Sequence, residues 1–414
     1  MAEGPHDLIE RRHVEATLTR DKGPDARLLS WTIEDFTQKG DNFATFVTSV
    51  NVKYSLDNMD QLVSYVIKIN PLRKGSEIDE FTRSIIQKEI NFYTEILPDL
   101  NSALESAGFR RLRIPTFYFA EKQIGREMLF FEDLRSQGFK MADRKKGLDA
   151  AHTYLVLKEL ARFHAVSHIL QAKIKDLSDR YPHLKIDWVT SIEEQRQFLQ
   201  NMLASQTEHA ISLLKIVKGY EKVLHWATRI QRNSLDLLKD QVVRIGSPFE
   251  VICHGDCYNN NLLFKYDASG APVDVVLLDL QATRVASLGT DLSYLLLTSL
   301  EGSLMSSSEQ DFLMAYYKSF SDVTKAAGQL VPFSFEDLRK EFRSKHPYGF
   351  VFSLIIIPFI VMNSSDIPEA EEFLSGKNEE GFKQKMIDAL ESNPFLRPRF
   401  LSVLDYAIEA GIVD

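Results

Sequence analysis

The stretch His254-Gly-Asp-Cys-Tyr-Asn-Asn-Asn-Leu-Leu-Phe264 decides the fold of this 414-residue chain. It places Asp256 in a loop directly after a short apolar segment that is typical of a buried strand. Asn261 follows five residues later, at the start of a second strand. A β-hairpin is predicted over 261–280, with a turn-rich linker at 267–272. The stretch therefore predicts a loop aspartate followed by a hairpin that begins with an asparagine.

The predicted hairpin brings two polar side chains together. Antiparallel pairing about the middle of the turn matches position 261 with position 278, so Asn261 and Asp279 should lie side by side at its open end. Asp279 lies in the apolar run Val275-Val-Leu-Leu-Asp-Leu280, where an unpaired carboxylate is costly unless a cation meets it. With Asp256 upstream, these oxygen atoms suit Mg²⁺, which keeps several waters for a phosphate. The alternative, three polar caps of a tight loop, explains the buried Asp279 poorly.

Residues 1–133 predict a small, mostly antiparallel sheet that carries one helix. The strands are predicted over Phe43–Tyr54, Leu62–Ile69, Thr116–Phe119 and Met128–Phe131. The first two form a hairpin with its turn at Asp57-Asn58. The helix is predicted over Glu77–Ile96 and should stop at Pro98.

The pattern after Asp133 changes to long helical periodicities, with the hairpin at 261–280 embedded among them. Helices are predicted over Tyr154–Leu170, Ile192–Ile216, Glu221–Leu238, Asp291–Leu300, Glu309–Ala327, Phe335–Phe342 and Gly349–Met362. The sequence therefore predicts an α+β fold with two lobes: a small antiparallel N-lobe over 1–133 and a larger, mainly helical C-lobe over 134–414.

Two further charged residues point to a binding site in the first lobe. Glu89 falls on the apolar face of its predicted helix, so its carboxylate needs a cation. Lys68 lies mid-strand between two isoleucines and is the natural partner, although a snorkelling lysine and a half-exposed glutamate would be the ordinary alternative. The turn Gly40-Asp-Asn-Phe-Ala44 precedes the first strand and could cover a phosphate, or be any β-turn.

The composition of the chain limits the kinds of molecule that we expect it to bind. The chain has 49 basic and 58 acidic side chains and a net charge of −9, which argues against nucleic acid or an anionic membrane as a partner. Its two cysteines, Cys253 and Cys257, have no second pair to form a zinc site, and a reducing compartment explains them best. The longest apolar run, Phe350–Met362, is broken by Pro358 and is too short to span a bilayer. We therefore expect a cytoplasmic protein.

A lysine on a strand, a glutamate on a helix, a loop aspartate, an asparagine at plus five and a strand-end aspartate follow one another in the order found in kinases. Across nearly its whole length the chain resembles the ecdysteroid kinase-like family, a branch of the choline kinase and aminoglycoside phosphotransferase superfamily. The stretches that carry the resemblance are the catalytic-loop stretch at 254–261, Gly40-Asp-Asn-Phe-Ala44, Glu89-Ile-Asn-Phe-Tyr-Thr-Glu-Ile-Leu-Pro98, Met141-Ala-Asp-Arg-Lys-Lys-Gly-Leu148, Leu160-Ala-Arg-Phe-His-Ala165, Asp279-Leu-Gln281 and Asp291-Leu-Ser-Tyr294.

The resemblance implies a bilobal, protein-kinase-like fold and an ATP- and Mg²⁺-dependent phosphotransferase that acts on a hydroxyl of a small molecule. In this family pattern Asp256 is the base that orients the acceptor hydroxyl, and Asn261 and Asp279 are the Mg²⁺ ligands. Lys68 holds the ATP phosphates and Glu89 is its ion-pair partner. The remaining nucleotide contacts would come from Gly40, Asn42, Phe43 and Ala44 above the phosphates and from Phe131, Glu132, Asp133 and Leu134 as the hinge that meets adenine.

Several interpretations stay open at this point. Ecdysteroids or related steroid alcohols are the first acceptors that the resemblance suggests. Choline-like or aminoglycoside acceptors would need an acidic or aromatic cage. A catalytically silent nucleotide-binding protein is the third possibility, although all five polar site residues are present. The aromatic residues of the second lobe could line an apolar acceptor pocket or simply form core: Tyr316, Tyr317, Phe320, Phe333, Phe335, Tyr348, Phe350 and Phe352.

Overall fold

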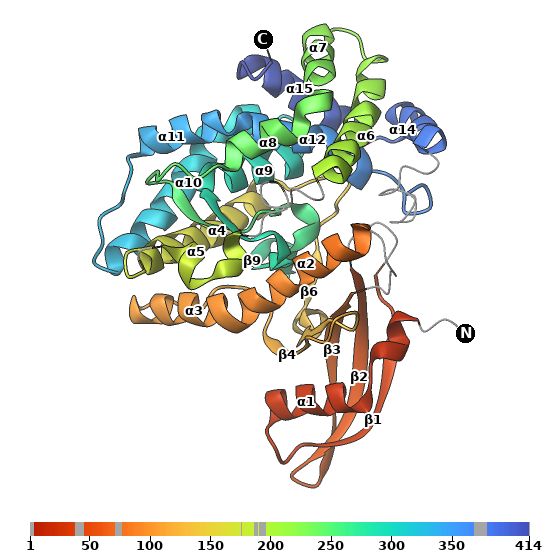
Figure 1. Cartoon of the computed structure of the whole chain (residues 1–414), viewed down its shortest axis with the longest axis vertical. Coiled ribbons are helices and arrows are strands. Elements are labelled where there is room, and N and C mark those ends of the chain that lie inside the picture. The colour runs from red at the N-terminus through yellow and green to blue at the C-terminus, as the bar shows by residue number, and fades with distance from the viewer. Residues whose placement is uncertain are drawn as a thin grey trace.

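The computed structural model describes residues 4–37, 45–70, 77–174, 176–185, 189, 196–367 and 379–413. A β-rich lobe at the N-terminal end lies against a larger helical lobe (Figure 1). The two-lobed α+β fold expected from the sequence is confirmed. The turn that carries Gly40, Asn42, Phe43 and Ala44 lies outside the described residues.

The first lobe is built on an antiparallel sheet of five described strands in the order β1-β2-β3-β5-β4. The strands are β1 (Arg27–Glu34), β2 (Phe46–Leu56), β3 (Met59–Ile69), β4 (Phe117–Glu121) and β5 (Met128–Glu132). The helix α1 (Arg11–Lys22) packs against this sheet, where Val14 and Leu18 join Val50, Val52 and Ile67 in a separate hydrophobic core.

The hairpin of β2 and β3 matches the prediction. The strands pair from Phe46 opposite Ile69 to Leu56 opposite Met59, and Asp57 and Asn58 form the turn between them. Both turn residues have positive φ, 52° and 60°. Asp and Asn tolerate this left-handed conformation, and two such residues in succession suit the right-handed twist of a two-residue hairpin.

The helix predicted to stop at Pro98 continues past it, so this prediction was wrong. The helix α2 (Glu77–Asn91) passes through a π-helical turn (Phe92–Ile96) into α3 (Leu97–Ser106). Pro98 directly follows the π-helical turn, in which the N–H of Leu97 donates to the carbonyl of Phe92, so the hydrogen-bond ladder changes at the position of the proline. The buried side chains of this segment pack against α4 of the second lobe, so the helix spans both lobes (Figure 1).

The second lobe is mainly helical. Its longer helices are α4 (Ala150–Gln171), α6 (Arg196–Leu214), α7 (Glu221–Ile230), α8 (Ser234–Val242), α9 (Leu288–Ser299), α10 (Leu304–Ala326), α11 (Phe335–Ser344), α12 (His346–Ile360), α14 (Glu379–Ser392) and α15 (Leu396–Glu409). Every residue of α9 is buried, and α12 packs along it. The helix predicted over 221–238 is divided into α7 and α8 by a short 3₁₀ turn. Among the described helices, none combines the length and the apolar character that crossing a membrane would need.

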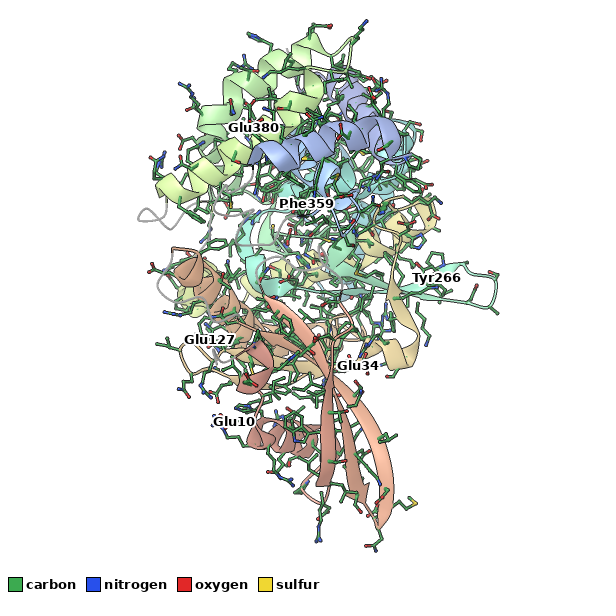
Figure 2. All side chains as sticks on the ribbon, turned by 90° about the vertical axis from the view of Figure 1, so that its right-hand side faces the viewer. Glu10, Glu34, Glu127, Tyr266, Phe359 and Glu380 are labelled. Carbon is green, nitrogen blue, oxygen red and sulfur yellow. The ribbon has the colours of Figure 1, made fainter. Side chains whose placement is uncertain are left out.

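The second lobe also contains two small sheets, one more than the predicted single hairpin. One has the order β6-β8-β9, and the other pairs β10 with β7. The strands are β6 (Phe139–Met141), β7 (Glu250–Cys253), β8 (Leu262–Tyr266), β9 (Pro272–Leu277) and β10 (Arg284–Ser287). The strands β6, β7 and β10 have three or four residues, which is too short to show a periodicity. Figure 2 shows Tyr266, at the end of β8, on the hairpin that projects from the side of the molecule.

The register of this hairpin confirms the predicted pairing. Leu262 pairs with Leu277, and the N–H of Leu278 donates to the carbonyl of Asn261 over 2.9 Å. The lobe boundary between 133 and 134 stays a prediction. In the structure β5 ends at Glu132, and β6 already pairs with β8 of the second lobe.

Candidate active site

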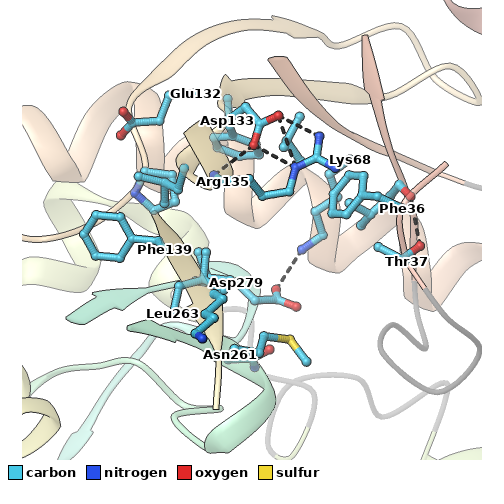
Figure 3. Close-up of a pocket in the computed structure, with 18 of the residues that line it drawn as sticks. Phe36, Thr37, Lys68, Glu132, Asp133, Arg135, Phe139, Asn261, Leu263 and Asp279 are labelled. Atoms are coloured by element: carbon cyan, nitrogen blue, oxygen red, sulfur yellow. Dashed lines mark hydrogen bonds and ion pairs between the residues drawn. The ribbon is translucent and has the colours of Figure 1, made fainter. Parts of the chain in front are cut away.

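A pocket of about 380 Å³ lies where the two lobes meet. Lys68 and Glu89 line it from the first lobe, and Asn261 and Asp279 line it from the second. The segment 131–134 that connects the lobes also contributes to its wall. Figure 3 shows Lys68 and Asp279 reaching toward each other, with Asn261 beside Asp279.

Lys68 is the centre of a buried ion network. Its Nζ atom lies 2.5 Å from Oε2 of Glu89 and 2.7 Å from Oδ1 of Asp279. It also contacts Oε1 of Gln281 at 3.3 Å. Burial alone would lower the pKa of Lys68, but the carboxylates of Asp279 and Glu89 outweigh it and hold the pKa above its ordinary value. Lys68 therefore stays charged in the pocket.

Asp279 has an unusual backbone conformation that directs its side chain into the pocket. It lies just past β9 with φ 63° and ψ 68°, in the left-handed region. The chain is held there by Glu89, whose Oε1 accepts the N–H of Leu280 over 3.3 Å. Gln281 donates from Nε2 to Oδ2 of Asp279 over 3.2 Å. Glu89 and Gln281 therefore each contact both the lysine and the Asp279 segment.

The loop that carries Asp256 is fixed by a buried aspartate on α9. The carboxylate of Asp291 accepts the backbone N–H groups of His254, over 2.6 Å, and of Gly255, over 2.9 Å. Gly255 has φ 85°, and a Cβ atom there would lie 2.1 Å from the carbonyl oxygen of Ala282. Only glycine fits this close approach, so the backbone on both sides of Asp256 has a defined path.

The Asp256 side chain accepts a hydrogen bond at each oxygen. Oδ2 accepts Nδ2 of Asn261 over 2.9 Å, and Oδ1 accepts the hydroxyl of Tyr294 over 2.5 Å. Burial, together with repulsion from the Asp279 carboxylate, raises the pKa of Asp256 to about 7. A carboxyl with this pKa is suited to exchange a proton near neutral pH.

The segment predicted as the adenine hinge forms the opposite side of the pocket (Figure 3). Asp133 holds the guanidinium of Arg135 with Oδ2 2.6 Å from Nη2, and its Oδ1 accepts the backbone N–H of Arg135 over 3.0 Å. The same guanidinium stacks over the ring of Phe36 at 3.9 Å. Phe131 and Leu134 add apolar surface. This side of the pocket therefore offers flat, apolar walls with an anchored cation at the edge.

At the end of the pocket away from this segment, the oxygen atoms of Asn261 and Asp279 are suited to a hard divalent cation. Asn261 uses its Nδ2 atom on Asp256, which leaves its amide oxygen as the atom that can ligate. Asp279 contributes a carboxylate, and an amide oxygen with a carboxylate is a donor set that Mg²⁺ accepts.

Histidines and cysteines near the loop serve packing and support. Nε2 of His164 lies 3.1 Å from Oδ2 of Asp291, and its Nδ1 lies 2.7 Å from the hydroxyl of Tyr316. Burial raises the pKa of the Cys253 and Cys257 thiols, which disfavours the nucleophilic thiolate. His164 therefore supports Asp291, and the environment of the two thiols disfavours a nucleophilic role for them.

The aromatic residues considered for an acceptor pocket are mostly core. Tyr316, Phe320, Phe333 and Phe350 are buried and belong to the main hydrophobic cluster of the second lobe. Two others of the residues considered, Tyr348 and Phe352, are also buried, but they contact the ring of Tyr294, which bonds to Asp256, as does Tyr258 of the loop. The aromatic surface nearest the loop aspartate thus comes from α9 and α12.

The structure brings the five predicted polar residues together as two bonded groups: Lys68 with Glu89 and Asp279, and Asp256 with Asn261. The hydrogen bond from the N–H of Leu278 to the carbonyl of Asn261 joins the backbones of the two groups. Sequence reasoning assigned no role to Tyr294 or Gln281. The signal for Tyr294 was its spacing of three from Asp291 on one helix, and the signal for Gln281 was its place two residues after a carboxylate that needs partners.

A two-lobed α+β fold with these charged residues between its lobes is the arrangement found in kinases. The model of the ecdysteroid kinase-like family matches residues 39–329, more than half of the chain, and the protein belongs to this family. The match includes Lys68, Glu89, the loop of Asp256 and Asp279, and it supports a small-molecule kinase. The comparison with curated proteins gives no match.

Solved structures of small-molecule kinases resemble the chain only distantly. A Plasmodium vivax ethanolamine kinase is 14% identical, with a TM-score of 0.41 over 95% of this chain and 87% of that one. A GDP complex of a mutant aminoglycoside 2′-phosphotransferase is 12% identical, with a TM-score of 0.42 over 93% and 100%. A thermostable mutant of an aminoglycoside phosphotransferase is 10% identical, with a TM-score of 0.34 over 91% and 97%. With TM-scores below 0.5, these likenesses carry no argument, and the family assignment rests on the sequence match.

Proposed function

We propose that this protein transfers the γ-phosphoryl group of ATP to a hydroxyl of a small, neutral, lipophilic alcohol, such as an ecdysteroid or a related steroid alcohol. The observation that carries the proposal is the ion pair of Lys68 with Asp279 beside Asn261, which holds the Asp256 carboxylate, at one end of a pocket of small-molecule size.

The nucleotide would lie along this pocket. Its adenine fits the flat apolar side formed by Phe131 and Leu134, and its phosphates point toward Lys68. The ammonium group of Lys68 is held in place by Glu89, so it can neutralise phosphate charge without moving far. Phosphoryl transfer depends mainly on such positioning and charge stabilisation.

Asn261 and Asp279 are the residues that would hold Mg²⁺, which when bound neutralises charge on the phosphate oxygens. Asp256 orients the acceptor hydroxyl and takes its proton. The acceptor oxygen forms the new bond to phosphorus, the bond from phosphorus to the ADP oxygen breaks, and the hydroxyl proton ends on the Asp256 carboxylate.

A neutral acceptor follows from the surroundings of Asp256. Its side-chain partners, Asn261 and Tyr294, are uncharged donors, and the rings of Tyr258 and Phe352 pack against the ring of Tyr294. An apolar alcohol gains by burial against such rings. A cationic acceptor would lose hydration there, and the nearby carboxylates already have partners in Lys68, Asn261 and Tyr294.

A screen of ATP turnover against steroid, choline-like and xenobiotic alcohols tests the proposal, with mass detection of a phosphate on one of them. We expect a phosphorylated product from a neutral lipophilic alcohol, and none from the Asp256→Asn variant. Tight MgATP binding without transfer to any alcohol would favour a nucleotide-binding protein that lacks catalysis.

A further inference from the structure

The helix α9 contacts the Asp256 loop at two points that are one helical turn apart. The first is Asp291, which accepts the backbone N–H groups of His254 and Gly255. The second is Tyr294, whose hydroxyl donates to Oδ1 of Asp256 over 2.5 Å. Residues three apart share one face of a helix, so a single rigid element holds both the backbone and the side chain of the loop.

The ring of Tyr294 is fixed from three sides. It lies edge-on to Tyr258 of the loop, at 6.1 Å between centroids and 88° between planes, and to Phe352 of α12, at 4.9 Å and 66°. Tyr348 of α12 contacts it at 6.2 Å. Only 4% of Tyr294 is exposed. A ring held in this way keeps its hydroxyl at one place, at little further entropic cost.

Two donors fix the plane of the Asp256 carboxylate. Asn261 holds Oδ2 and Tyr294 holds Oδ1. The torsion of an aspartate carboxylate about its last bond is soft, so one donor alone would leave a wide range of orientations. Each oxygen of a carboxylate can accept about two hydrogen bonds, so both keep a lone pair in a defined direction. An acceptor hydroxyl can donate its hydrogen bond to one of these free lone pairs.

Resting on the kinase activity proposed above, we propose that Tyr294 is a positioning residue that holds the Asp256 carboxylate in the orientation that accepts the proton of the acceptor hydroxyl. The O–H group carries this role, and the ring serves to place it. Tyr348 and Phe352, which hold the ring, lie beyond residue 329, where the family match ends.

The variant Tyr294→Phe tests this role, because it keeps the ring and removes only the hydroxyl. ATP hydrolysis with water as acceptor, and phosphorylation of ecdysone as a steroid probe, give kcat and KM. We expect kcat to fall by about 10- to 100-fold while KM for ATP changes less than about twofold. The matched control is Tyr406→Phe, which removes a buried hydroxyl bonded to Glu309 at 2.8 Å and should leave both constants unchanged.

A double-mutant comparison separates positioning from general structural support. In the Asp256→Asn background, Tyr294→Phe should lower the residual rate less than twofold, because the group that it orients has lost its function. The proposal is overturned if Tyr294→Phe keeps the wild-type kcat, or if it lowers kcat by the same factor in both backgrounds. Full activity of Asp256→Asn alone would instead reject the proposed function of the site, and with it the role of Tyr294.

Discussion

Asp256 is set apart from the other carboxylates of the site by its surroundings. Lys68 contacts Asp279 and Glu89 directly, whereas the partners of Asp256 are the uncharged donors Asn261 and Tyr294. Burial raises the pKa of Asp256 to about 7, and burial raises that of Glu89 to about 7 as well, so the distinguishing feature of Asp256 is its uncharged partners. On this difference in partners we propose that Asp256 takes the proton and that Asp279 contributes to charge stabilisation.

The substitution Asp256→Asn keeps the shape of the side chain and removes its capacity to take a proton. We expect turnover to fall by about 10²-fold or more, because general base catalysis contributes roughly that factor. Binding of MgATP, measured by calorimetry, should stay near that of the wild type. A variant that keeps full turnover would remove Asp256 from the mechanism.

Asp279 and Asn261 differ in charge, and this difference predicts unequal effects on metal binding. Asp279→Ala should reduce Mg²⁺-dependent ATP binding more than Asn261→Ala, because only the carboxylate supplies a negative charge to the cation. Calorimetry of ATP with and without Mg²⁺ measures both variants. If Asp279→Ala keeps the metal dependence of the wild type, Asp279 is not a ligand.

The catalytic loop depends on one glycine. The variant Gly255→Ala adds a Cβ that meets the carbonyl of Ala282, as well as a strained φ of 85°. Gly270→Ala is the matched control, because its φ is 82° and no atom lies within 4 Å of the added Cβ. The control should cost about 1 kcal/mol from backbone strain alone, and Gly255→Ala about 3 kcal/mol or more.

Thermal unfolding of both variants, followed together with turnover, checks this prediction. The melting temperature should fall further for Gly255→Ala, which should also lose turnover, while Gly270→Ala should keep it. Equal melting temperatures with full activity would mean that the loop tolerates a side chain at position 255.

The elements that the sequence predicted well are those with a strong local signal. The hairpin of β2 and β3 was predicted from β-branched alternation around Asp57-Asn58, and the register of β8 and β9 followed from the position of its turn. Local sequence rules failed where the effect of a residue depends on its position within a helix or on a contact with a distant part of the chain. Pro98 is typical of a helix end, yet the chain continues as a helix past it, directly after the π-helical turn. The contact of Tyr294 with Asp256 joins residues 38 positions apart, and no periodicity encodes it.

At the scale of the whole molecule, the helical lobe beyond the family match buries a histidine between several helices. His346, at the start of α12, packs edge-on to Phe342 of α11 at 4.7 Å and lies 3.1 Å from the hydroxyl of Tyr406 on α15. Burial lowers the pKa of His346 to about 4, with Glu309 opposing and Arg343 assisting this shift. This group therefore links the stability of the lobe to pH.

The sign of the pH dependence follows from the two pKa values. Between pH 6.5, the usual histidine pKa, and pH 4, the unfolded chain binds a proton at His346 and the folded chain does not. The contribution to stability is complete above pH 6.5 and is lost on acidification, by about 3 kcal/mol at pH 4. Thermal unfolding of wild type and His346→Gln between pH 7 and 5 measures it. The variant should show the flatter dependence, and parallel curves would exclude His346 as the cause.

The most direct test of the central claim is the phosphorylation assay with ATP and Mg²⁺ on an ecdysteroid, a neutral xenobiotic alcohol, choline and an aminoglycoside, followed by mass spectrometry. We expect a product that carries one added phosphate, formed from the ecdysteroid with a higher kcat/KM than from choline or the aminoglycoside, and absent with Asp256→Asn. Faster phosphorylation of a cationic acceptor than of any neutral alcohol would contradict the assignment of a lipophilic substrate. MgATP binding without phosphorylation of any acceptor would contradict the proposed kinase activity.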